Sequence, residues 1–320
     1  MNKNRVMIPK SAIHGAEGEP YMTTKCDLAP YLAGLFVLAG GVDVAPAQTA
    51  AQQPPDHPVV TVHGSSYTPR SILVRNMGTP EDQTTQFPPH KIVGNIYYVG
   101  TRTLSSFLVV TQRGNILIDS TYERNVPTIE QSVRQLGFKF SDVKILLGNH
   151  AHADHQEGDA LVKQMTGARV VAMAEDVPAL QAIKPGGKDH PIDKLVHDGD
   201  RVTLGGMTLV AHLTPGHTRG CTTWTTRARE GRKTYDVVFN CSLRPPGMLT
   251  PAIVDEFNRS FKLVRSLRCD VPLGDHPAQY RMQEKYARLS NSGPNPFIDA
   301  TGCFVEADIE EAMFHAIMDQ

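Results

Sequence analysis

The chain has 320 residues, of which 40% are hydrophobic, and its formal net charge is −1. This length and apolar content suffice for one large domain, or two small ones, with a buried core. The near-neutral charge argues against nucleic acid as a partner, because proteins that bind phosphate backbones usually carry a basic excess.

The first 47 residues have the features of a secretory signal peptide. Lys25 precedes the apolar segment 28–42, which is short for a membrane span, and the small residues at 45–47 provide a cleavage site. We therefore expect cleavage after Ala47, export to the periplasm or the medium, and no membrane attachment afterwards. The polar stretch before Met22 leaves the start codon open, with Met7 and Met22 as candidates. A buried helix or a membrane anchor is the alternative for this segment.

Five cysteines are present, and loss of Cys26 with the signal peptide leaves an even number, as expected of an exported protein. We predict two disulfide bonds. Cys221–Cys241 would cross two neighbouring strands, and Cys269–Cys303 would tie the last segment to the main body. Each would stabilise the fold by about 3–4 kcal/mol in the chain-entropy description. Four buried free thiols are the alternative.

Composition divides the exported part into two regions. Residues 48–90 are rich in Pro, Gln, Thr and Ser, which predicts an extended lead-in with little core of its own. We predict a single domain over 91–320. Its first short, β-branched and aromatic segments indicate strands at 95–100, 106–111 and 115–120. A helix capped by Asn125 should follow and end at Gly137.

The remaining pattern predicts a layered α/β fold. A strand at 144–147, a helix at 159–165 and a strand at 169–173 complete a βαβαβ order, whose sites usually lie at the carboxyl ends of strands. Beyond these, we expect two hairpins and two amphipathic helices, at 201–213, 222–240, 253–267 and 309–317. Two similar β-then-α halves suggest two sheets face to face with helices outside.

The segment His150-Ala-His-Ala-Asp-His155 directly follows the strand at 144–147. Three imidazoles and a carboxylate packed this closely would repel one another or lack partners, unless a divalent metal binds them, and zinc prefers these ligands. His150 and His152 lie at i and i+2, so they point the same way in an extended loop. Asp154 and His155 can turn toward a neighbouring point, so we predict two ions rather than one. A polar loop with scattered histidines is the alternative.

Two other histidines follow apolar segments in a similar way. His217 ends the sequence Thr214-Pro-Gly-His217, and His276 ends Gly274-Asp-His276. Each motif alone is weak, but together they supply the ligands that two ions still need. His212 lies two residues before the first of these loops, and we expect its side chain to alternate away from the site.

These motifs resemble those of the metallo-β-lactamase superfamily, and within it the subclass B3 metallo-β-lactamases. The similarity runs from about Phe87 to the C-terminus and includes the segments 95–100, 220–224 and 295–297. The resemblance implies an α/β fold, an αββα four-layer sandwich with its site at the edge of the two sheets. It implies two Zn²⁺ ions. Their implied ligands are His150, His152 and His217 for the first zinc, and Asp154, His155 and His276 for the second.

The strand after the Thr-Pro-Gly-His loop distinguishes branches of the superfamily. Glyoxalase II and the lactonases carry a bridging Asp there, whereas this chain reads Val-Phe-Asn-Cys-Ser over 238–242. Ser242 resembles the serine that lines the B3 site, which leaves Cys241 for Cys221. Arg244 stands where B3 enzymes often have a second small hydroxyl residue, and it could bind a carboxylate as a charged fork. Asn149 replaces the usual Ser or Thr before the first histidine.

The resemblance implies a zinc-dependent β-lactamase of broad spectrum, carbapenems included, and thus a role in antibiotic resistance. Zinc-bound hydroxide, oriented by Asp154, would attack the lactam carbonyl, while Ser242 and Arg244 would hold the substrate carboxylate. We expect small-molecule β-lactam substrates, no nucleic-acid partner and a monomer. The alternatives are another zinc hydrolase of this fold, lactonase or thioesterase-like, and an exported zinc-binding protein without catalysis.

Overall fold

Two β-sheets that share an apolar core organise the structure, a computed structural model that describes residues 56–246, 248–289 and 293–320. The predicted signal peptide, Cys26 and the candidate start residues lie outside these ranges. Within them, no helix has the length and apolarity needed to cross a membrane.

The first sheet has seven strands, in the order β3-β4-β5-β6-β7-β8-β9. Strands β3 to β6 form an antiparallel meander, and β6 to β9 run parallel. The parallel part requires crossovers, and helices α2 (Val126–Gln135) and α4 (Asp159–Thr166) provide two of them. The strand bounds are β3 His90–Val93, β4 Ile96–Tyr98, β5 Phe107–Thr111, β6 Gly114–Ile118, β7 Val143–Leu147, β8 Arg169–Met173 and β9 Lys194–Val196.

The second sheet has five strands, in the order β10-β11-β12-β13-β14. Both predicted hairpins are present, and Gly205 and Gly206 turn the first with φ of 53° and 90°, the left-handed values that a tight two-residue turn requires. Helix α6 (Pro251–Ser266) then leads to β14, which runs parallel to β13. The bounds are β10 Arg201–Leu204, β11 Met207–Leu213, β12 Thr222–Glu230, β13 Lys233–Asn240 and β14 Val271–Gly274.

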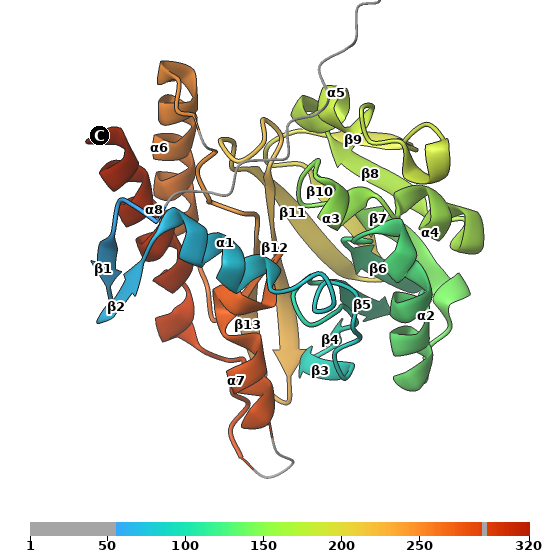
Figure 1. Cartoon of the computed structure of the whole chain (residues 1–320). Helices are drawn as coiled ribbons and strands as arrows, with labels where there is room; N and C mark the ends of the chain where they lie inside the picture. The colour runs from blue at the N-terminus through green and yellow to red at the C-terminus, as the bar shows by residue number, and fades with distance from the viewer. Residues whose placement is uncertain (1–55, 247, 290–292) are drawn as a thin grey trace, which may run out of the picture. The chain divides into compact units, whose positions relative to one another are not determined.

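The sheets pack face to face, and helices cover their outer faces. Fully buried side chains from both sheets, such as Phe107, Trp224 and Phe239, form the core between them. Helices α2 and α4 close a second cluster on the first sheet, while α6 and α8 (Val305–Met318) share a third cluster. Figure 1 shows green α2 and α4 on one side of the strands and orange-to-red α6 and α8 on the other. The predicted αββα sandwich is therefore confirmed.

The segment before the first sheet departs from its prediction. Instead of an extended lead-in, it contains a hairpin, β1 (Val60–Val62) with β2 (Ser65–Tyr67), and helix α1 (Pro69–Met77). The expectation of little core is wrong, because Ile72 is fully buried in a cluster with residues of α8. Thr68 and Ser71 form a capping box that starts α1.

The predicted helix cap at Asn125 is also wrong. Its side chain makes no bond to the start of α2 and donates instead to the carbonyl of Gln83 and to Thr121 Oγ1. Asn125 therefore ties the approach to the first sheet to the loop after β6. Helix α2 nonetheless begins directly after this residue.

Candidate metal centre

The three predicted ligand segments meet at one edge of the two sheets, each directly after a strand. The loop that contains His150 follows β7, His217 follows β11, and His276 follows β14. The first loop turns into the short helix α3 (Ala153–Gln156), which changes the direction of Asp154 and His155 relative to the two preceding histidines. The six side chains therefore come from loops that follow strands of both sheets.

His150, His152 and His217 form one triad. Their ligand-capable nitrogens all lie within 4.8 Å of one another, and their rings are 4.7–4.8 Å apart, centroid to centroid. Nδ1 of His217 is 2.9 Å from the carbonyl oxygen of Arg244, so Nε2 is the nitrogen left for a ligand role. Nε2 of His150 is buried without a hydrogen-bond partner among the described residues.

Asp154, His155 and His276 form a second triad, whose ligand-capable atoms also lie within 4.8 Å of one another. Asp154 Oδ2 is 3.2 Å from Nε2 of His155 and 3.9 Å from Nε2 of His276. Nδ1 of His276 is 3.0 Å from the carbonyl oxygen of Thr103, which again leaves Nε2 for a ligand role. The rings of His150 and His155 are 4.2 Å apart, so the two triads are adjacent.

Two buried carboxylates that the sequence analysis missed lie behind these rings. Asp119 Oδ2 is 3.4 Å from Nδ1 of His155, and Asp275 Oδ2 is 3.3 Å from Nδ1 of His150. Asp275 also accepts the backbone N–H of Ser242. Carboxylates in this position fix the ring orientation of a metal-bound histidine and raise its basicity. In the sequence, Asp119 lies inside the predicted strand at 115–120, and Asp275 is notable only as the residue before His276.

Asp176, also missed, joins two of the ligand loops. It accepts hydrogen bonds from Ala151 N at 2.8 Å, Thr218 Oγ1 at 2.9 Å and Gly220 N at 2.6 Å. A Cβ at position 220 would lie 2.5 Å from the backbone nitrogen of Asp176, so only glycine fits this approach. The carboxylate thereby holds the His150 and His217 loops in a fixed relation.

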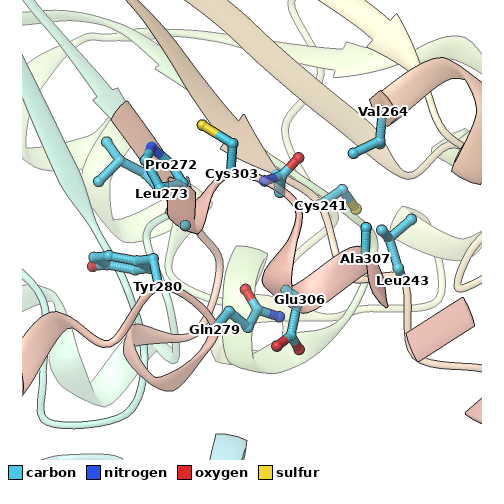
Figure 2. Close-up of a pocket in the computed structure, with 12 residues that line it drawn as sticks. Cys241, Leu243, Val264, Pro272, Leu273, Gln279, Tyr280, Cys303, Glu306 and Ala307 are labelled. Carbon is cyan, nitrogen blue, oxygen red and sulfur yellow. The ribbon is translucent and has the colours of Figure 1, made fainter. Parts of the chain in front are cut away.

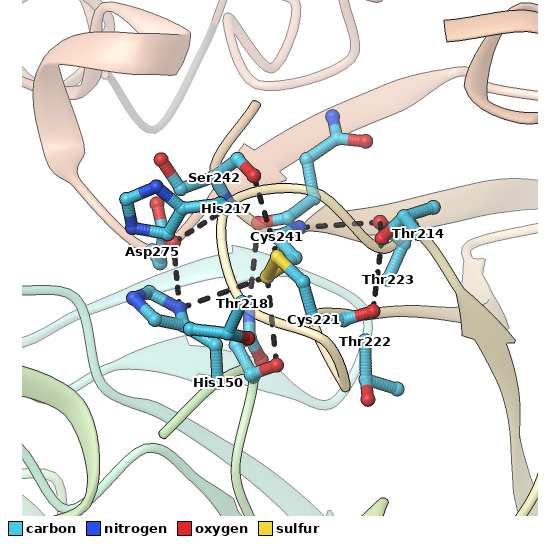
Figure 3. The surroundings of a disulfide bond; sticks show 12 residues. His150, Thr214, His217, Thr218, Cys221, Thr222, Thr223, Cys241, Ser242 and Asp275 are labelled. Atoms are coloured by element: carbon cyan, nitrogen blue, oxygen red, sulfur yellow. Dashed lines mark hydrogen bonds and ion pairs between the residues drawn. A yellow bond between two sulfur atoms is a disulfide. The ribbon is translucent and has the colours of Figure 1, made fainter. Parts of the chain in front are cut away.

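A disulfide bond lies directly behind the first triad (Figure 3). The structure joins Cys221 to Cys241, with their Cα atoms 5.9 Å apart, and Cys241 Sγ lies 3.6 Å from Nδ1 of His150. It joins the second predicted pair as well, Cys269 and Cys303, with Cα atoms 6.0 Å apart. Because the Cys221 and Cys241 sulfurs are bonded to each other, they are not thiolates that could compete for a metal beside His150.

The pKa shifts of the two triads are of the kinds that suit metal ligands. Burial lowers the pKa of His150 and His217 well below the usual value, so both rings are neutral, as metal ligation requires. Burial also acts to lower the pKa of His155, but the Asp154 carboxylate and a bond to Asp119 hold it well above normal. Burial opposes ionisation of Asp154, yet its histidine neighbours keep its pKa low. A metal ion held by Asp154, His155 and His276 would take the place of a proton on Nε2 of His155, which faces the Asp154 carboxylate.

The donor set thus fits a metal of the zinc type. It offers five imidazoles and one carboxylate, no thiolate, and a buried Nε2 on His150 that has no hydrogen-bond partner among the described residues. An open pocket of about 160 Å³ lies over the triads, so protein atoms do not close the site. Its lining residues are Leu73, Asn76, Met77, His150, His152, Asp154, His217, Ser242, Arg244 and His276.

The pocket also locates the remaining predicted residues. Ser242 and the half-buried Arg244 both line it, and Ser242 Oγ lies 3.4 Å from the backbone nitrogen of Arg244. His212 does not line it and bonds to Thr225 Oγ1 on the neighbouring strand, as predicted from alternation. Asn149 donates from its side chain to the carbonyl of Asn240, which links β13 to the ligand loop. Three lining residues, Leu73, Asn76 and Met77, belong to helix α1, and the sequence analysis did not anticipate them.

Comparisons with known proteins identify relatives of this chain. The family description "Metallo-beta-lactamase superfamily" matches residues 99–229. Among solved structures, FEZ-1 metallo-beta-lactamase from Legionella gormanii is 43% identical, with 72% of this chain and 96% of that chain covered and a TM-score of 0.68. BJP-1, a subclass B3 metallo-beta-lactamase of Bradyrhizobium japonicum, is 35% identical, with 75% and 96% covered and a TM-score of 0.69.

Curated relatives match shorter segments of the chain. A hydroxyacylglutathione hydrolase of Methylobacterium sp. (strain 4-46) is 37% identical over 93 residues, 29% of this chain and 33% of that protein. The mitochondrial persulfide dioxygenase ETHE1 of Homo sapiens is 28% identical over 112 residues, 35% of this chain and 38% of that protein. The chain thus spans only about a third of the length of these two relatives.

The fold, the strand-end site and these matches define a hydrolase of the metallo-β-lactamase superfamily, to which this chain belongs. Its similarity within the superfamily is to subclass B3 metallo-β-lactamases, as the sequence motifs predicted.

Proposed function

We propose that the chain is an exported, dinuclear zinc β-lactamase that opens the amide ring of β-lactam antibiotics over a broad spectrum, carbapenems included. One observation carries this proposal: two adjacent ligand triads share an open pocket with an arginine that could bind a carboxylate. The names of the solved relatives, FEZ-1 and BJP-1 metallo-beta-lactamases, support the same reaction.

His150, His152 and His217 would hold one zinc, and Asp154, His155 and His276 the other. When bound, zinc lowers the pKa of water to about 7 and polarises a carbonyl oxygen. The Asp154 carboxylate is the acceptor in the site that can orient the attacking water and receive its proton. Asp119 and Asp275 keep the His155 and His150 rings in the tautomer that presents Nε2.

Ser242 and Arg244 would bind the carboxylate that β-lactam substrates carry. No carboxylate forms an ion pair with the Arg244 guanidinium in the described part of the chain, so its charge is available to a ligand. Burial is the main cause of the lowered pKa of His152 and His217, and the positive charge of Arg244 lowers both further. Arg244 lines the pocket together with these two rings. A substrate anchored there would lie within the pocket over both triads.

The test uses the purified chain with a chromogenic cephalosporin and a carbapenem. We expect hydrolysis of both, loss of turnover with a chelator and recovery with zinc. His152→Ala should lose activity and remain folded, while the matched control His212→Ala, on a strand-end histidine outside the pocket, should keep it. Turnover that survives the chelator, or a fully active His152→Ala enzyme, would contradict the proposal.

The names of the curated relatives favour thioester hydrolysis as a second candidate. A glutathione thioester assayed beside the cephalosporin separates the two, since the larger kcat/KM identifies the substrate class. A non-catalytic zinc-binding protein would turn over neither. Export is tested by the location of the full-length chain in cell fractions and by the mass of its mature N-terminus.

A further inference from the structure

Arg75, on helix α1, binds two partners at once. Its Nη2 donates to Oε1 of Glu306 on α8 at 2.5 Å, and its Nε donates to Oδ1 of Asn76 at 3.1 Å. The Arg75 side chain is about three-quarters buried, with 24% of it exposed. Arginine can do this because its donors form a rigid planar fork, which lysine lacks.

The acidic side of this contact is a buried pair. Glu306 and Glu310 follow each other by one helical turn on α8, and Glu310 is fully buried. Burial raises the pKa of both carboxyls, and that of Glu310 is raised further by Glu306. Burial disfavours two ionised carboxylates side by side, and the positive charge of Arg75 lies against the Glu306 carboxylate.

Glu306 does not face the metal pocket. Figure 2 shows it beside Gln279 on the wall of a separate, small internal cavity. Gln279 in turn accepts the backbone N–H of His276. The bond from Arg75 joins Glu306 to helix α1, part of which lines the metal pocket.

The bond from Arg75 fixes the amide of Asn76. Arginine Nε–H is a donor only, so the oxygen of the Asn76 amide must face it, and the NH₂ group must point the other way. Asn76 is 2% exposed, and its surroundings include the pocket that it lines together with the metal-site residues. Its NH₂ group has no hydrogen-bond partner among the described residues.

We propose that Asn76 is a substrate-binding residue whose NH₂ group donates to an acceptor oxygen of the β-lactam, and that Arg75, held by Glu306, positions it. This inference rests on the proposed function. The acceptor is either the substrate carboxylate or the carbonyl of the acylamino side chain. Both groups have oxygen lone pairs that can accept a hydrogen bond. A donor that is already oriented and partly shielded from water makes a stronger bond to such an oxygen.

Steady-state kinetics of the zinc enzyme test the proposal. We expect Asn76→Ala to raise KM about tenfold with kcat changed by less than twofold, the loss expected for one hydrogen bond. Arg75→Lys keeps the charge opposite Glu306 but removes the second arm of the fork, so we expect a similar rise in KM without a change in Tm. Val74→Ala, on the exposed face of the same helix (60% exposed), is the control and should leave both constants unchanged.

Two substrates identify the acceptor. A rise in KM for both an acylamino cephalosporin and a carbapenem, which lacks the acylamino group, assigns the carboxylate. A rise for the cephalosporin alone assigns the side-chain carbonyl. An unchanged KM for Asn76→Ala with both substrates overturns the role of Asn76.

A measurement without turnover separates this inference from the proposed function. In the zinc-loaded protein labelled with ¹⁵N-asparagine, the side-chain amide signal of Asn76 should shift in Arg75→Lys and stay in place in Val74→Ala. Absence of β-lactam hydrolysis in the wild type would defeat the proposed function. If the chemical shift of the Asn76 amide is the same in Arg75→Lys as in the wild type, the positioning role of Arg75 is wrong, even if β-lactam hydrolysis is found.

Discussion

Asp119 contacts His155 with one carboxylate oxygen and the ligand loop with the other. Its Oδ2 lies 3.4 Å from Nδ1 of the ring, and its Oδ1 accepts the backbone N–H of Asn149 at 2.8 Å. Asp119 holds this position with a left-handed backbone, φ 60°, which is costly for a residue other than glycine. One side chain at the end of β6 thus sets both the ring and the loop that carries it.

Replacing this carboxylate should weaken the second metal site. In Asp119→Asn the amide can still accept from Asn149, but its NH₂ group would donate to Nδ1 of His155 and place the ring proton on Nε2. We expect a 10–100-fold loss of affinity for the second zinc, measured by competition with a chromophoric chelator. Asp142→Asn, at an exposed carboxylate, should bind zinc as the wild type does. Equal affinity in the two variants would contradict the assigned role.

Docking of α1 should depend on Ile72, which is fully buried against α8. A nine-residue helix is not stable alone in water, so packing must hold it. We expect Ile72→Ala to weaken the docked state by about 2–5 kcal/mol and to speed hydrogen exchange of the α1 amides. Val74→Ala should leave that exchange unchanged. If the α1 amides of both variants exchange alike, α1 is held by other contacts.

The two disulfide bonds should have different effects on the metal site. Removing Cys221–Cys241 by double substitution to Ala should cost about 3 kcal/mol of stability and also weaken zinc binding, because the bond lies against His150. The Cys269–Cys303 bond closes a larger loop, so its removal should cost about 4 kcal/mol, with zinc affinity preserved. Denaturant titration and zinc competition measure the two quantities. Loss of zinc affinity in the second variant would argue against a local effect.

His90 should make the fold less stable in acid. Burial among Tyr98, Tyr286 and Phe297 lowers its pKa from 6.5 to about 4, despite a bond to the carbonyl of Pro88. Above pH 6.5 the ring is neutral in both the folded and the unfolded chain. Between pH 6.5 and 4 only the unfolded chain takes up this proton, so stability falls as the pH falls, by about 3 kcal/mol in total.

His90→Phe keeps an aromatic ring but cannot titrate, so it isolates this effect. The free energy of unfolding of the wild type, minus that of the variant, should decrease from pH 6.5 to pH 4 and then level off. Other acidic groups titrate in the same range, and the subtraction removes their contribution. A difference that does not change with pH would contradict the assignment to His90.

Much of the fold could be predicted because local patterns and tertiary packing agree. The strands of the βαβαβ unit and helix α6 each bury the face that their apolar periodicity indicates, and the Gly205-Gly206 turn lies where its residue types predict. Helix α1 was not predicted because its apolar pattern covers only a few residues, and the Pro-rich composition of the surrounding segment favoured an extended chain. Its capping box, Thr68 with Ser71, was the local sign that a helix begins there.

The candidate site divides in the same way. Four of the six ligands share one motif with fixed spacing, and His217 and His276 each follow an apolar segment, so the six side chains could be brought together from the sequence. Asp119, Asp176 and Asp275 act through contacts with residues that are distant in the sequence. Asp176, for example, binds Ala151 and Gly220, which are 25 and 44 positions away. A single aspartate in the sequence does not indicate such contacts. The part of Asn76 in the pocket wall likewise depends on how α1 docks.

The six candidate ligands belong to three loops that follow β7, β11 and β14, in two different sheets. No single half of the chain can therefore assemble the centre, and loosening either half should release a bound metal ion. Metal content measured on a purified sample thus doubles as an assay of whether the entire polypeptide has folded. A variant that still retains its full complement of metal has kept both halves in register, whatever its catalytic rate.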